Sequence, residues 1–124
     1  MQENVFDNKE HVREIYEFGN DDPYFENFYR GVVLLNEKKP REALHELWVA
    51  ADCDNFTNVY RYILAASIDA GLGADDIIPM FIVWIVRART TGNKHDNEVV
   101  NSARDFVVDH FGSLDKRIRS IKSL

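Results

Sequence analysis

The strongest constraint on the fold of this chain is that apolar residues recur every three or four positions, in segments separated by scarce glycine and proline. The 124 residues include only six glycines and three prolines, and most of them lie between the periodic segments. This spacing is typical of amphipathic α-helices, whereas strands alternate every second residue. The pattern predicts an all-α fold of about six to seven helices, arranged as antiparallel helical hairpins or as a compact multi-helix bundle.

Seven helical segments follow from this periodicity and from the residues that begin and end helices. Proline at the first helical position begins two segments, at Pro23 and Pro40, and Gly19 and Gly112 each follow the end of a segment. The predicted segments span about 8–18, 22–37, 40–51, 56–70, 77–86, 96–111 and 115–122. We expect Asp96 or Asn97 to cap the sixth of them.

The longest apolar run, residues 77–86, is too short for a membrane span, which needs about twenty residues. Because the run is apolar on all sides, its periodicity does not separate a buried strand from a buried helix. The acidic Asp75 and Asp76 before it and the basic Arg87 and Arg89 after it favour a helix. If one side of this helix is left uncovered, we expect it to form a homodimer interface.

The size of the chain, 14.4 kDa, predicts a single all-α domain over residues 1–124. This domain would begin with a short polar lead at 1–7 and end with a short basic helix at 114–124. The polar beginning predicts no signal peptide. The single cysteine, Cys53, has no partner for an internal disulfide and lies between two aspartates, which favours a small buried side chain over a nucleophile. These features predict a cytoplasmic protein.

A pattern of small and bulky residues runs across the second and third segments. A glycine here would let the next helix approach closely, and alanines would suit the places where the helices cross. The residues are Gly31, Ala43, Leu47 and Ala50, with Leu34 where a bulky side chain is expected. This pattern resembles one tetratricopeptide repeat at 24–57, and a shift of 34 residues gives a degenerate second repeat at 58–91.

The resemblance implies a short right-handed stack of helical hairpins that acts as a non-enzymatic adaptor, chaperone-like or regulatory factor. Such a protein would bind a partner protein or peptide in an aromatic groove on its concave side. The groove residues it implies are Phe25, Phe28, Tyr29, Val32, Leu35, Tyr62, Ala66 and Asp69. The alternative interpretation is that the same side chains are ordinary core.

No complete catalytic, cofactor or metal-binding motif is found in the sequence. Glu42 and His45 have the Glu-x-x-His spacing of di-iron helices, but no second copy exists, which favours a solvated surface pair. The Gly71–Gly73 turn lacks the glycine and lysine of a phosphate loop. Trp48 and Trp84 are expected to fill the core. We therefore predict no enzyme activity, cofactor or metal.

Charge supplies two further hypotheses. The net charge of −6 argues against a general nucleic-acid binder. One alternative function is a small acidic inhibitor or immunity-type protein that neutralises a basic partner surface, through Glu10, Glu14, Glu17, Asp21, Asp22 and Glu26. A second alternative is weak nucleic-acid contact through the basic C-terminal helix, with Lys116, Arg117, Arg119 and Lys122 as the contact residues.

Overall fold

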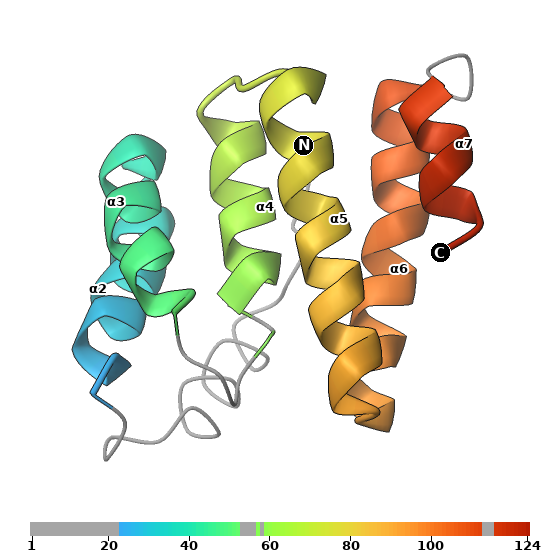
Figure 1. Ribbon diagram of the computed structural model, residues 1–124. Helices are drawn as coiled ribbons and strands as arrows, with labels where there is room; N and C mark the ends of the chain where they lie inside the picture. The colour runs from blue at the N-terminus through green and yellow to red at the C-terminus, as the bar shows by residue number, and fades with distance from the viewer. Residues whose placement is uncertain (1–22, 53–56, 58, 113–115) are drawn as a thin grey trace. The chain divides into compact units, whose positions relative to one another are not determined.

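The predicted all-α fold is confirmed by a computed structural model, which describes residues 23–52, 57, 59–112 and 116–124. All regular structure in these residues is helical (Figure 1). The helices are α2 (Phe25–Asn36), α3 (Pro40–Ala50), α4 (Val59–Asp69), α5 (Ala74–Thr91), α6 (Lys94–Phe111) and α7 (Lys116–Lys122). None of these helices combines the length and the apolar character that a membrane span requires.

Several predictions lie outside the described residues. They are the polar lead at 1–7, the helix at 8–18, the position of Cys53 and the acidic side chains before residue 23. Within the structure, the chain divides into two compact units, residues 1–71 and 72–124. The boundary falls at Gly71–Leu72, inside the predicted second repeat. The single domain over 1–124 stays a prediction.

In the first unit, α2 and α3 form an antiparallel hairpin whose close approach depends on Gly31. A Cβ atom placed on Gly31 would lie 2.5 Å from Cδ2 of Leu47 and 3.5 Å from the backbone oxygen of Ala43. Ala43, Leu47 and Ala50 have no exposed surface. Pro40 begins α3, as predicted. The packing role expected of the small residues in this hairpin is therefore confirmed.

Helix α4 supplies much of the buried surface of the first unit. Every residue from Val59 to Ser67 is buried, including Arg61, so this helix has no exposed stripe over that length. A helix that is buried all round belongs to an interior, whereas an amphipathic helix lies at a surface. Tyr62 and Ala66, which the tetratricopeptide resemblance assigns to a groove, both lie within this buried stretch.

In the second unit, α5 confirms that residues 77–86 are helical, and the helix extends beyond them at both ends. It ends where Gly92 adopts the left-handed conformation, with φ of 66°, that glycine accepts at low cost. The side chain of Asn93 then caps α6, because its Oδ1 accepts a hydrogen bond from the Asp96 backbone N–H at 2.9 Å. The cap predicted at Asp96 or Asn97 was wrong by about one turn, since Asp96 is the donor that the cap satisfies.

Arg89 joins the ends of three helices in the second unit. Its guanidinium donates hydrogen bonds to Oδ1 of Asn97, to Oδ1 of Asn101 at 2.8 Å and to the backbone oxygen of Leu124 at 3.3 Å. Asn97 in turn donates from Nδ2 to the backbone oxygen of Ala88 at 3.0 Å. The planar guanidinium group of arginine donates hydrogen bonds in several fixed directions, so it can reach all of these acceptors. The ammonium group of lysine, at the end of a flexible side chain, does so less well.

We expect Arg89→Lys to lower the free energy of unfolding by about 1 kcal/mol, because at least one of these charge-assisted hydrogen bonds is lost. Urea denaturation followed by circular dichroism measures this change. Arg104→Lys, on α6, makes the same chemical change outside the network and serves as the control. Equal stability of the two variants would show that the Arg89 network does not contribute to the fold.

Candidate protein-binding surface

The predicted groove residues fall into a buried group and an exposed group. Phe28 and Tyr62 have no exposed surface, and Val32 has 2%. The rings of Phe28 and Tyr62 meet edge to face, with centroids 5.3 Å apart and planes at 83°. Leu35 and Ala66 are buried as well. The chain itself covers these side chains, so the alternative interpretation as core applies to them and a groove lined by them is not open to a partner.

The exposed group includes Phe25 and Tyr29, which lie one turn apart on α2. Their rings stack with centroids 6.1 Å apart and planes at 16°. Tyr29 keeps 48% of its surface exposed, Phe25 is half-buried and Asp69, on α4, is exposed. Tyr29 follows Phe28 by one residue, so it is rotated by about 100° from the buried face of α2. Of the predicted groove, this stacked pair is the aromatic part that a partner could touch.

Trp48 is a second exposed aromatic residue, and here the expectation of a core position was wrong. Its side chain is 47% exposed and meets the ring of the buried Tyr60 edge to face, with centroids 6.2 Å apart. The buried line of α3 passes through Ala43, Leu47 and Ala50, and Trp48 lies about 100° from Leu47. The adjacent Val49 is also exposed, at 39%. Trp84, by contrast, is fully buried as predicted.

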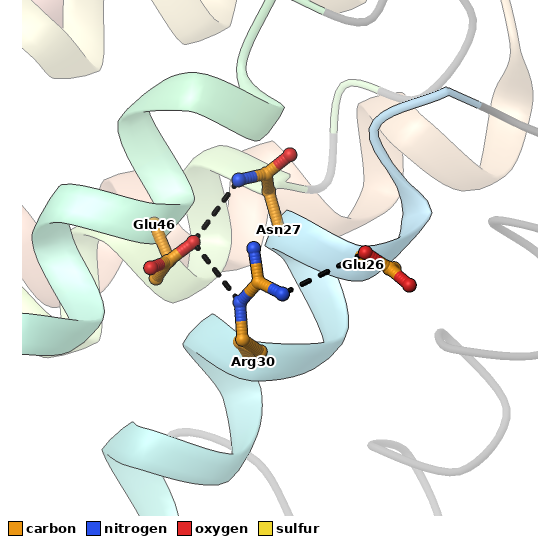
Figure 2. Close-up of polar contacts among 4 residues, drawn as sticks. All are labelled: Glu26, Asn27, Arg30 and Glu46. Atoms are coloured by element: carbon orange, nitrogen blue, oxygen red, sulfur yellow. Dashed lines mark hydrogen bonds and ion pairs between the residues drawn. The ribbon is translucent and has the colours of Figure 1, made fainter.

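Polar contacts hold α2 against α3 (Figure 2). Oε1 of Glu46 accepts hydrogen bonds from Nδ2 of Asn27 at 3.0 Å and from Nε of Arg30 at 3.4 Å. Arg30 also forms an ion pair with Glu26, one turn earlier on α2, at 3.7 Å. Because Glu46 is only 22% exposed while Glu26 is 83% exposed, the contacts across the hairpin are the better shielded ones. We assign this cluster to the positioning of the two helices.

The alternative function, an acidic inhibitor of a basic partner, depends on six acidic residues. The structure describes one of them, Glu26. Glu26 is exposed and is engaged by Arg30 of its own helix. The other members of the proposed acidic group lie outside the described residues.

The basic C-terminal residues belong to a packed helix. Ile118 and Ile121 of α7 are fully buried, and Lys116, Arg119 and Lys122 are exposed. Arg117 instead forms an ion pair with Asp75 of α5, Nη1 to Oδ1, at 2.8 Å. Removing the last ten residues would therefore delete core side chains, and charge-neutralising substitutions at the three exposed residues are the cleaner test of nucleic-acid contact.

Glu42 and His45 are both exposed on α3. Within the described part of the chain, no group of three or more histidine, cysteine, aspartate or glutamate side chains is placed to hold a metal ion.

Comparisons of this chain with protein-family models, with curated proteins and with solved structures found no match. The tetratricopeptide resemblance stays a prediction drawn from the residues at 24–57. The surface described above must therefore be interpreted from its own chemistry.

Proposed function

We propose that this chain is a non-enzymatic module that binds another protein or a peptide through the exposed aromatic side chains of α2 and α3. The observation that carries the proposal is that Tyr29 and Trp48 each leave close to half of their surface exposed. Tryptophan and tyrosine are enriched among the few residues that supply most of the binding energy at protein interfaces. A binding role as adaptor, chaperone-like or regulatory factor fits such a surface.

Both aromatic side chains already rest on neighbouring rings. Tyr29 stacks on Phe25, and Trp48 packs against the edge of Tyr60. A side chain held in this way loses less conformational freedom when a partner covers it, so more of the gained contact appears as affinity. The preorganisation of these two residues supports the proposal. The single cysteine supports the cytoplasm as the proposed compartment, and we propose no membrane or nucleic-acid partner.

The proposal predicts that a double variant, Tyr29→Ala with Trp48→Ala, loses a partner that the unaltered chain captures from an extract of the source cells. Each truncation of an interface hot spot costs about 2 kcal/mol or more, so the pair, at about 4 kcal/mol together, should reduce affinity by about 1000-fold. The matched control is Glu42→Ala with His45→Ala, two exposed residues of α3. Circular dichroism establishes that both variants keep the helical fold.

Salt distinguishes this proposal from the acidic-inhibitor alternative. Capture through aromatic contacts should survive about 0.5 M salt, at which exposed charges are strongly screened. With the captured partner added, the fluorescence of Trp48 should shift to the blue as its ring leaves water, and a Trp48→Phe variant should lack that shift. Retention of the same partner by the folded double variant would refute the proposal, as would capture that disappears at high salt.

A further inference from the structure

Helix α5 carries an exposed apolar line that the proposed binding surface does not include. We call it the α5 stripe and define it as Pro79, Ile82, Val83 and Val86. Val83 is 44% exposed and Val86 52%, Pro79 is exposed and Ile82 is half-buried. Spacings of three and four residues place these side chains on one face of the helix. The opposite face, which includes Trp84 and Ile85, is buried.

Opposite charges lie at the two ends of the α5 stripe. Asp75 and Asp76 occupy the first turn of α5 and are both exposed, and the side chain of Asp75 is 93% exposed. Asp76 continues the line of the stripe, because it lies three residues before Pro79. At the other end, Arg87 directly follows Val86 and is half-buried. The surface is thus acidic at one end, apolar in the middle and basic at the other.

We propose that the α5 stripe binds the α5 stripe of a second copy of this chain, with the two helices antiparallel. A two-fold axis between Ile82 and Val83 places Pro79 opposite Val86 of the second copy. The same axis brings Asp76 level with Arg87 of the second copy to within about 3 Å along the helix, because the two differ by two residues of 1.5 Å rise. Two such pairs form in each dimer.

The charges at the two ends of the α5 stripe favour a second copy of this chain as the partner, and they favour the antiparallel orientation. In a parallel arrangement Asp76 would face Asp76 and Arg87 would face Arg87, so both ends would repel. The antiparallel arrangement is self-complementary, as a two-fold interface requires. It also pairs the positive end of each helix dipole with the negative end of the other.

The dimer is expected to be weak. One stripe of four side chains buries less than the roughly 800 Å² per partner of a stable interface, which places it among transient contacts. Sedimentation equilibrium of the full chain from about 10 µM to about 1 mM, a range that covers transient affinities, should show an average mass that rises from 14.4 kDa towards twice that value. A constant 14.4 kDa at all concentrations would overturn the proposal.

Charge exchange tests the antiparallel register. Asp76→Lys alone and Arg87→Glu alone should each weaken association by about tenfold, because each creates two repulsive pairs per dimer. An equimolar mixture of the two variants should restore it, since every facing pair is again opposite in charge. The matched controls, Asp105→Lys on α6 and Lys116→Glu on α7, make the same net-charge changes at exposed positions elsewhere and should associate as the unaltered chain does.

Two outcomes contradict the proposal. A mixture that associates no better than either variant alone would exclude the antiparallel register. If the control variants weaken association equally, the weakening comes from the change in net charge and not from the facing pairs. Val83→Asp provides a test that does not depend on Arg87 or its surroundings. Its exposed position should leave the fold intact, as circular dichroism checks, while two carboxylates meet at the centre of the dimer. This variant should stay monomeric, and its dimerisation would exclude the α5 stripe.

Discussion

Phe28→Ala is expected to lower the free energy of unfolding by about 3–5 kcal/mol, the range for truncation of a buried phenylalanine. Phe28 has no exposed surface, and its ring meets the edge of the equally buried Tyr62. The substitution therefore removes apolar contact, leaves a cavity and ends the aromatic pair. Urea denaturation followed by circular dichroism measures the loss.

Tyr29→Ala is the control at the next position. Because Tyr29 is 48% exposed and loses only its stacking with Phe25, the free energy of unfolding should change by about 0.5 kcal/mol or less. The comparison separates the two roles predicted for groove residues. If the Phe28→Ala variant is as stable as the unaltered chain but fails to bind a partner, Phe28 belongs to the binding surface. That result would contradict its place in the core.

Helix type and helix ends could be predicted where the local sequence decides them. Pro40 fixes the beginning of α3 because its ring suits the first helical position and the missing N–H is not needed there. Residues 77–86 were ambiguous by composition alone, and the charges on either side resolved them as a helix. The spacing of Gly31, Ala43 and Leu47 predicted the close hairpin, because the size of the side chains between two helices limits how closely they can approach.

The sequence left both the groove and the core interpretation of Tyr62 open, because burial depends on residues distant in the sequence. Tyr62 lies in the stretch of α4, Val59 to Ser67, that is buried on all sides, which no periodic pattern on that helix could reveal. Trp48 was predicted to fill the core, but its angular offset from Leu47 on the helical wheel places it outside the buried line of α3. That offset was the signal available in the sequence.

The candidate site was predicted only in part for the same reason. The same helix carries three aromatic residues, Phe25, Phe28 and Tyr29. Residue type alone does not indicate which of their rings faces α4. Neighbouring positions differ by about 100° around the helix, so one residue separates a core ring from a surface ring. A resemblance to a repeat family indicates which residues would line a groove. It does not show whether other parts of the same chain cover those residues.

Gly31→Ala is expected to lower the free energy of unfolding by up to about 2 kcal/mol, even though alanine favours helices by about 1 kcal/mol over glycine. The new Cβ would lie 2.5 Å from Cδ2 and 2.6 Å from Cγ of Leu47, closer than van der Waals contact. Leu47 is fully buried and cannot rotate its side chain into solvent. Overpacking of this kind costs about 1–3 kcal/mol, which exceeds the gain in helix propensity. Urea denaturation measures the net effect.

A double-mutant cycle isolates this close contact. Leu47→Ala alone should cost about 2–5 kcal/mol by leaving a cavity, but it also removes both atoms that the new Cβ would meet. In that background Gly31→Ala should stabilise the chain by about 1 kcal/mol through helix propensity, so the sign of its effect reverses. A Gly31→Ala effect that is the same in both backgrounds would show that α2 and α3 do not approach at this position.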